Sequence, residues 1–374
     1  MAAPTANEKK NISSNSSHIP DDISLMILSK LPVKSWSLLL ENHDFFKKFR
    51  NNVISKSHPL YDDACQILTQ YERPCWNVYL FSGDKFENKV KLDFPPSSFH
   101  RRTPQCSFTP FSVLGSAVNG ILCIFDIKYA LLWNPATEEI KVILPGFAEF
   151  KHDLTTFIKR CGFGYDHITH DYKVIQHVDY IGSRIDKYPM LKPFWEIYSL
   201  KSNSWRKIDI DIPTMSWSCN NGVYFDGVCH WQELSNKLVS FNLCNEMCFI
   251  TPSFLEDLPN DFDVVNLNVL NGCVAIITSR IDSTSFQISI LGEFGIKESW
   301  IKLFDIERMS CNIYPIGIGM NGNIFFKTND DKHEITCLNL TTGLIEEIDL
   351  KGNRFSCQVV IYKRNLHPIR EIRD

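Results

Sequence analysis

Leu131-Leu132-Trp133-Asn134-Pro135-Ala136-Thr137-Glu138-Glu139-Ile140-Lys141-Val142-Ile143 is the stretch of this sequence that decides the fold. Two apolar runs flank a polar turn with Asn and Pro, which predicts a strand, a turn and a second strand. The same plan returns at residues 196–208, 238–250 and 335–348, and a degenerate copy at 287–304 carries Gly292 and Gly295 in its turn. A repeat at intervals of several tens of residues indicates a fold built from similar β units.

Four shorter glycine-marked segments lie between these hairpins, at residues 119–124, 227–231, 271–276 and 321–326. Each is the expected partner strand of a hairpin. Radial closure of such units leaves only short, protected sheet edges. The sequence therefore predicts a mainly β fold, a β-propeller of about six blades behind a short helical N-terminal segment. A two-sheet β-sandwich is the alternative.

Composition limits the function classes. The 374 residues are enough for two domains, with 44% apolar and 22% charged residues typical of a globular protein. The net charge of −4, with both signs interspersed, lacks the basic footprint that phosphate backbones require, so no nucleic acid is expected as a partner. Aromatic residues reach 12%, which suits packed β structure.

The 13 cysteines are scattered and include no Cys-x-x-Cys pair. Structural zinc sites need paired thiolates at close spacing. We therefore expect reduced, buried thiols, and we expect no metal and no other cofactor. Residues 1–17 are polar and lack the apolar core of a signal peptide, and no window approaches the roughly 18 apolar residues of a membrane span. We expect a location in the cytoplasm or nucleus and no membrane partner.

The N-terminal part divides into a tail and a helical segment. Residues 1–17 are rich in Ser, Asn and Lys and are predicted to be disordered. Pro20-Asp21-Asp22 is a good helix start, and Ile23, Met26, Ile27 and Leu31 then recur at helical spacing until Pro32 ends the helix. A second helical run is predicted from Trp36 to about Phe49.

Several of these motifs resemble those of one plant family. The run 19–23 followed by 27–35 is similar to the opening of a plant F-box, and the segments 119–123, 133–137, 162–166 and 171–175 resemble the F-box-associated, Kelch-like domain of the same proteins, a group that includes the S-locus F-box-like proteins. The resemblance covers residues 19–350, and the order and spacing of the motifs make it specific.

The resemblance implies a non-catalytic subunit of a ubiquitin ligase. In that family the F-box helices bind a Skp-type adaptor, which is tied to a cullin, and the C-terminal domain holds a protein substrate. Such a bridge raises the local concentration of target lysines near the charged ubiquitin. Carried over to this sequence, the adaptor-binding positions are Ile19, Pro20, Ile23, Ile27, Leu28, Leu31, Pro32 and Val33.

The sequence departs from the family after Ser35. The family has a second helix before a Lys-x-Trp element, whereas here Ser35 is followed directly by Trp36. A three-helix F-box reduced to two loses part of its core and docking face. The second hypothesis is therefore a propeller interaction protein that is uncoupled from the ligase.

An enzyme is the third hypothesis, and its candidate motifs are weak. Gly162-Phe163-Gly164 and Gly317-Ile318-Gly319 lack the third glycine and the helix of a dinucleotide site. His167 and His170 fall in a predicted polar turn, and the pairs Glu138-Glu139 and Glu346-Glu347 sit beside hairpin turns, where strand neighbours point to opposite faces. No catalytic residues are predicted.

We predict four parts: a disordered tail at 1–17, a shortened F-box-like motif at 18–58, a propeller-like domain at 75–362 and a C-terminal tail at 363–374. The loops Ile181–Pro193 and Phe254–Asp263 are long enough to rim a binding face. Trp205, Trp231 and Trp300 occupy repeat-like places and are predicted to pack between blades.

Overall fold

The computed structural model describes residues 43–55, 64–72, 75–82, 86, 88–93, 112–125, 130–151, 154–182, 185–210, 222–232, 237–252, 262–280, 285–306, 313–328, 334–351 and 357–369. The chain forms two compact units, Met1–Asn52 and Val53–Asp374. The helix α3 (His43–Ser55) covers the described part of the second predicted helical run and continues beyond it. Phe49 is its buried aromatic side chain.

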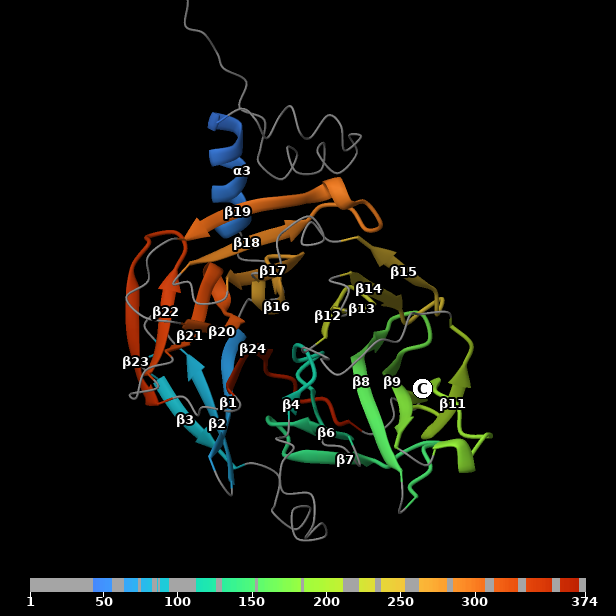
Figure 1. Cartoon of the computed structure of the whole chain (residues 1–374). Helices are drawn as coiled ribbons and strands as arrows, with labels where there is room; N and C mark the ends of the chain where they lie inside the picture. The colour runs from blue at the N-terminus through green and yellow to red at the C-terminus, as the bar shows by residue number, and fades with distance from the viewer. Residues whose placement is uncertain are drawn as a thin grey trace, which may run out of the picture. The chain divides into compact units, whose positions relative to one another are not determined.

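The second unit contains six antiparallel sheets of four strands each (Figure 1). The first is built from β24 (Cys357–Lys363), β1 (Ala64–Glu72), β2 (Cys75–Ser82) and β3 (Asn88–Leu92); the second from β4 (Ser112–Val113), β5 (Leu122–Phe125), β6 (Ala130–Asn134) and β7 (Glu139–Ile143); the third from β8 (Thr155–Asp166), β9 (Asp171–Ile181), β10 (Phe194–Ser199) and β11 (Ser204–Ile208). The fourth is built from β12 (Val223–Phe225), β13 (Val228–Gln232), β14 (Leu238–Asn242) and β15 (Cys248–Thr251); the fifth from β16 (Phe262–Leu270), β17 (Cys273–Arg280), β18 (Phe286–Leu291) and β19 (Trp300–Ile306); the sixth from β20 (Ile313–Ile318), β21 (Asn323–Thr328), β22 (Glu334–Asn339) and β23 (Ile345–Lys351). Short 3-10 turns lie at Ile185–Lys187, Lys297–Ser299 and Met320–Gly322.

These sheets are the blades of a propeller. The first strands of successive blades contact one another, β8 with β12, β12 with β16, β16 with β20 and β20 with β24, so they are the inner strands around the axis. The prediction of about six blades is confirmed, and the two-sheet sandwich is excluded. Blade 1 differs from the others because its inner strand β24 comes from the C-terminal end and pairs antiparallel with β1.

One turn type recurs in all six blades. The residue four positions after the end of the third strand has a positive φ in every blade: Phe86, Glu138, Asn203, Glu246, Gly295 and Gly343. In blades 2, 4 and 6 the third strand ends in Asn, whose side-chain oxygen accepts a hydrogen bond from the backbone N–H two residues on, at Ala136, Cys244 and Thr341. Such Asx turns explain why the hairpin repeat is visible in the sequence.

A second turn type joins inner strands to second strands. Asn119-Gly120, Asp226-Gly227 and Asn271-Gly272 each have two consecutive positive φ angles. This geometry is the type I′ turn of a two-residue hairpin, which Asn-Gly and Asp-Gly favour because both residues tolerate the left-handed region. These turns lie at one end of the blades.

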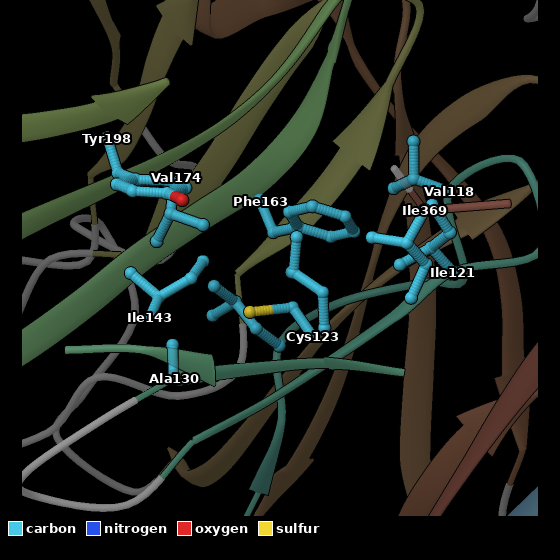
Figure 2. Packing of buried hydrophobic residues seen from close by; sticks show 11 residues of the cluster. Val118, Ile121, Cys123, Ala130, Ile143, Phe163, Val174, Tyr198 and Ile369 are labelled. Carbon is cyan, nitrogen blue, oxygen red and sulfur yellow. The ribbon is translucent and has the colours of Figure 1, made fainter. Parts of the chain in front are cut away.

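The core lies between neighbouring blades. Figure 2 shows the cluster between blades 2 and 3, where Cys123 and Ile143 of one blade face Phe163 and Val174 of the next. Equivalent apolar layers join blades 3 and 4, 1 and 2, 6 and 1, and 4 and 5. Trp231 packs in one of these layers and Trp300 against another, as predicted.

The C-terminal segment extends the fold beyond β24. The side-chain amide of Asn134 donates to the backbone oxygens of Asn365 (2.9 Å) and His367 (3.1 Å), and the Ile369 N–H donates to Glu139 (2.7 Å). Ile369 is buried in the cluster of Figure 2. The predicted domain end at 362 falls inside β24, β1 begins before the predicted start at 75, and the packed chain continues to Ile369.

Candidate interaction site on the propeller

The eight predicted adaptor-binding positions, Ile19, Pro20, Ile23, Ile27, Leu28, Leu31, Pro32 and Val33, lie outside the described residues. The predicted binding loop at 254–263 also lies outside them except for the first residues of β16. In the loop at 181–193 the described part includes Met190, which is 90% exposed. The site that can be built from atoms is therefore on the propeller itself.

The inner strands enclose a cavity of about 940 Å³ at the end of the channel where they finish. Its walls come from β12, β16, β20 and β24, and its rim from the connections that follow β4, β8, β10, β12 and β24. Each inner strand pairs on one side only, so its other edge faces the channel. No group of three or more potential metal ligands occurs among the described residues.

Two asparagines of β16 join it to β20 across the channel wall. The Asn266 amide donates to the Pro315 oxygen (3.1 Å), and the Asn268 oxygen accepts from the Ile318 N–H (3.1 Å). Asn268 also donates to Asn266. The side chains of Asn266 and Asn268 thus hydrogen-bond to backbone groups on the unpaired edge of β20. They lie beside apolar residues of the cavity wall.

Glycines at the inner strands allow close approach of neighbouring blades. A Cβ on Gly164 would lie 2.2 Å from the ring of Tyr224, and one on Gly317, whose φ is +155°, would lie 2.3 Å from the Val359 oxygen. Gly162-Phe163-Gly164 is part of β8, and Gly317 is part of β20. Gly162, Gly164 and Gly317 are therefore strand glycines, as predicted, whereas Gly319 follows β20 and precedes the 3-10 turn Met320–Gly322.

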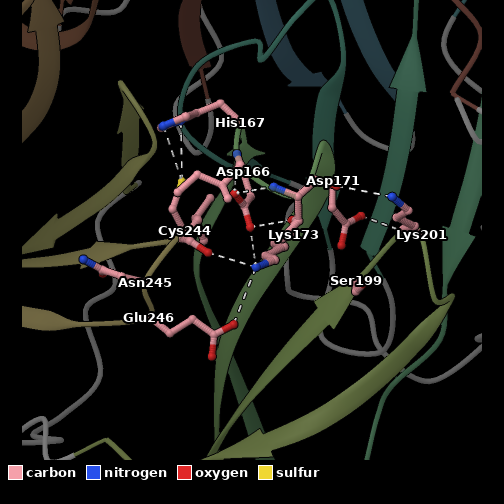
Figure 3. A network of polar contacts seen from close by, with 12 residues as sticks. Asp166, His167, Asp171, Lys173, Ser199, Lys201, Cys244, Asn245 and Glu246 are labelled. Atoms are coloured by element: carbon pink, nitrogen blue, oxygen red, sulfur yellow. Dashed lines mark hydrogen bonds and ion pairs between the residues drawn. The ribbon is translucent and has the colours of Figure 1, made fainter. Parts of the chain in front are cut away.

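A buried ion pair holds β8 and β9 of blade 3 together and contacts a turn of blade 4 (Figure 3). Lys173 Nζ of β9 lies 2.8 Å from Asp166 Oδ2 and donates to the Leu243 oxygen of the β14–β15 turn (2.9 Å). Glu246 of that turn lies 3.5 Å from Lys173 Nζ and also pairs with Arg206 of β11. The network therefore connects three strands of blade 3, β8, β9 and β11, with one turn of blade 4.

Asp166 is the centre of this network. Its side chain is fully buried and also accepts hydrogen bonds from the N–H of Ile168 (2.9 Å) and from the hydroxyl of Thr169 (2.6 Å). Burial alone would raise the pKa of Asp166, but the hydrogen bonds from Lys173 and Thr169 hold this pKa well below its ordinary value. The carboxylate is thus a structural anion that is saturated by its partners.

The histidines, several cysteines and the glutamate pairs singled out in the sequence lie in described strands and turns of the propeller. His167 and His170 are exposed in the β8–β9 turn, as predicted. Cys244 lies 3.5 Å from His167, but burial and Asp166 raise the pKa of the Cys244 thiol, which disfavours a nucleophilic thiolate. Glu139 accepts the hydrogen bond from Ile369 described above. Cys123, Cys229 and Cys337 are buried free thiols.

We expect the free energy of unfolding to depend on pH because two histidines, His177 and His230, are buried. Burial lowers the pKa of His177 to about 4 and of His230 to about 3, from 6.5 in the unfolded chain. Between these values the unfolded state binds more protons, so stability is fully present above pH 6.5 and falls as the pH decreases toward 4. Each histidine contributes a slope of about 1.4 kcal/mol per pH unit in this window.

The measurement is urea unfolding from pH 7.5 to 4 of the native chain and His230→Gln. We expect the free energy of unfolding of the variant to depend less steeply on pH, by about 1.4 kcal/mol per pH unit, because glutamine does not titrate. Carboxylates common to both proteins cancel in the difference. Parallel curves would contradict the assignment of a neutral, buried His230.

Residues 76–369 match the family model of the F-box associated beta propeller domain. Relatives from Arabidopsis thaliana include F-box protein CPR1 (25% identical; 59% of this chain and 58% of the relative), F-box/WD-40 repeat-containing protein 1 (25%; 58% and 54%) and an F-box/kelch-repeat protein (24%; 56% and 56%). The chain thus matches little more than half the length of each of these relatives.

Solved structures give a weaker likeness. An oligogalacturonate lyase covers 73% of this chain and 70% of its own, at 11% identity and a TM-score of 0.38. No helix among the described residues is long and apolar enough to cross a membrane. The family match, which spans most of the sequence, agrees with the resemblance found in its motifs. The chain belongs to the plant F-box protein family whose members carry an F-box-associated β-propeller domain.

Proposed function

We propose that this chain is the substrate-recognition subunit of a Skp–cullin–F-box type ubiquitin ligase. The observation that carries the proposal is the family match of the propeller at 76–369, behind an F-box-like sequence motif at 18–58. In this role the N-terminal motif binds a Skp-type adaptor and through it a cullin, and the propeller holds a protein target. The chain itself catalyses no step and works in the cytoplasm or nucleus.

The second candidate is an interaction protein that has lost ligase coupling. The direct succession of Ser35 and Trp36, where the family has a second helix, supports it. Such a protein would still bind the target and would protect it by competing with intact relatives. The two candidates differ only in adaptor binding.

Adaptor binding by the full chain tests the proposal. We expect a Skp-type adaptor to bind the native chain, and Leu31→Asp to weaken this binding at least tenfold, because a charge in an apolar helix-in-groove contact is desolvated without a partner. Ser29→Asp introduces the same charge off the apolar stripe and should bind as the native chain does.

A different result in the same binding experiment would contradict the ligase role. If the native chain does not bind the adaptor, while a family-like second helix inserted between Ser35 and Trp36 restores binding, the ligase role is wrong and the uncoupled interaction protein is right. Circular dichroism of each variant confirms that the propeller is intact.

A further inference from the structure

The proposed function does not use the channel cavity among the described inner strands. Its volume of about 940 Å³ lies within the range of small-molecule sites, roughly 300–1,000 Å³. It is formed entirely by the second compact unit. Its chemistry therefore does not depend on the N-terminal motif.

The walls of the cavity are mainly apolar. Aliphatic residues of four inner strands line it: Val223, Leu267, Ile316, Ile318, Val359 and Ile361. Among them lie the amides of Asn268 and Gln358. Small-molecule sites combine such apolar surface with a few polar groups that fix the orientation of the ligand.

The rim of the cavity is cationic. Lys201, Lys363 and Arg364 are exposed there, and none of the three is within ion-pair distance of a carboxylate among the residues the structure describes. Asp226 is the exposed carboxylate of the rim, and the other, Asp171, is buried and accepts the Lys201 N–H (2.8 Å). In a chain of net charge −4, this rim is locally positive.

The cations converge because of the fold. Lys201 follows β10, Lys363 ends β24 and Arg364 comes directly after it, so these residues reach the same mouth from blades 3 and 1. Charged groups around the mouth of a low-dielectric cleft concentrate ligands of the opposite sign. An anionic head group at the rim and an apolar body in the channel would satisfy both surfaces.

We propose that the channel binds a small organic acid with an apolar body, with the body against the aliphatic walls and the acid group at Lys201, Lys363 and Arg364. This site is separate from the proposed adaptor-binding motif. A negative result for adaptor binding therefore does not contradict the channel site, and a negative result for the channel site does not contradict the ligase proposal.

The test uses the full chain and 8-anilinonaphthalene-1-sulfonate, a fluorescent organic anion, as the reporter. We expect saturable binding of one probe per chain, displaced by decanoate at least tenfold more effectively than by 1-decanol, which has the same apolar body without the charge. Saturable binding by itself is not enough, because the probe also binds exposed apolar surface.

Two variants locate the probe. Replacing Lys201, Lys363 and Arg364 by glutamine should weaken probe binding at least tenfold, whereas replacing Lys91, Lys187 and Lys192, exposed cations away from the cavity, removes the same charge and should change it less than twofold. Ser116→Trp, which places a bulky side chain at the rim of the cavity, should abolish binding. Melting curves confirm that each variant is folded.

The proposal is overturned if decanol displaces the probe as well as decanoate, if the rim variant binds like its control, or if folded Ser116→Trp still binds one probe. Each of these outcomes would assign the probe to another surface or to apolar contact alone.

Discussion

A chain that ends at Lys351 is expected to lack a cooperatively folded propeller. The truncation removes β24, the inner strand of blade 1, which pairs with β1 from Ala64 to Gln70. It also removes the buried side chains of Val359 and Val360, each worth about 1.5–3 kcal/mol. Together with the lost strand ladder, this approaches the whole net stability of a domain, about 5–15 kcal/mol.

The matched control ends at Arg364. It keeps β24 and loses Ile369 and the hydrogen bonds to Asn134 and Glu139, so we expect a folded protein with a lower melting temperature. Thermal unfolding followed by circular dichroism, together with size-exclusion chromatography, measures both. A sharp melting transition at a similar temperature in the chain that ends at Lys351 would show that blade 1 closes without its C-terminal strand.

Asp166→Ala is expected to lower the free energy of unfolding by about 3–5 kcal/mol, because it leaves Lys173 buried without its closest anion. Lys173 keeps the Leu243 oxygen and the Glu246 carboxylate at 3.5 Å, which places the expected loss nearer the lower value. Urea unfolding at pH 7 measures it.

The control is an ion pair of the same type on the surface. Lys302 and Asp305 lie 3.2 Å apart and are each about half exposed, so Asp305→Ala should cost no more than about 1 kcal/mol. A double variant, Asp166→Ala with Lys173→Met, should lose less than the sum of the single variants, because the second change removes the uncompensated charge. Additive losses would show that the two groups are not coupled.

The outer strands of the propeller blades could be predicted from the sequence. The hairpins at 131–143, 196–208, 238–250, 287–304 and 335–348 are the third and fourth strands of blades 2 to 6, and the four glycine-marked segments correspond to second strands. They were predictable because their turns use local chemistry, such as the Asn134 side chain bonded to Ala136.

The inner strands were not predicted individually, although one signal for them was present. Asn119-Gly120, Asp226-Gly227 and Asn271-Gly272 form type I′ turns, and such a turn requires a strand before it as well as after it. This signal locates β12 and β16.

Other features had no local signal. β24 pairs with β1 about 300 residues away, so neither the closure of blade 1 nor the role of the segment after residue 363 could be found from patterns within a short window. For the same reason the rim of Lys201, Lys363 and Arg364 becomes visible only when the fold brings two distant segments together.

The pairing of Ala64 with Lys363 also bears on how the protein is made in the cell. A ribosome adds about 5–20 residues per second, so β1 waits on the order of 15–60 seconds for its partner strand. During this time its inner edge is available to other strands, and chaperones that cover such edges should bind the nascent chain. We expect a stop codon or frameshift anywhere before β24 to yield a protein that quality control degrades rather than a shortened, folded propeller.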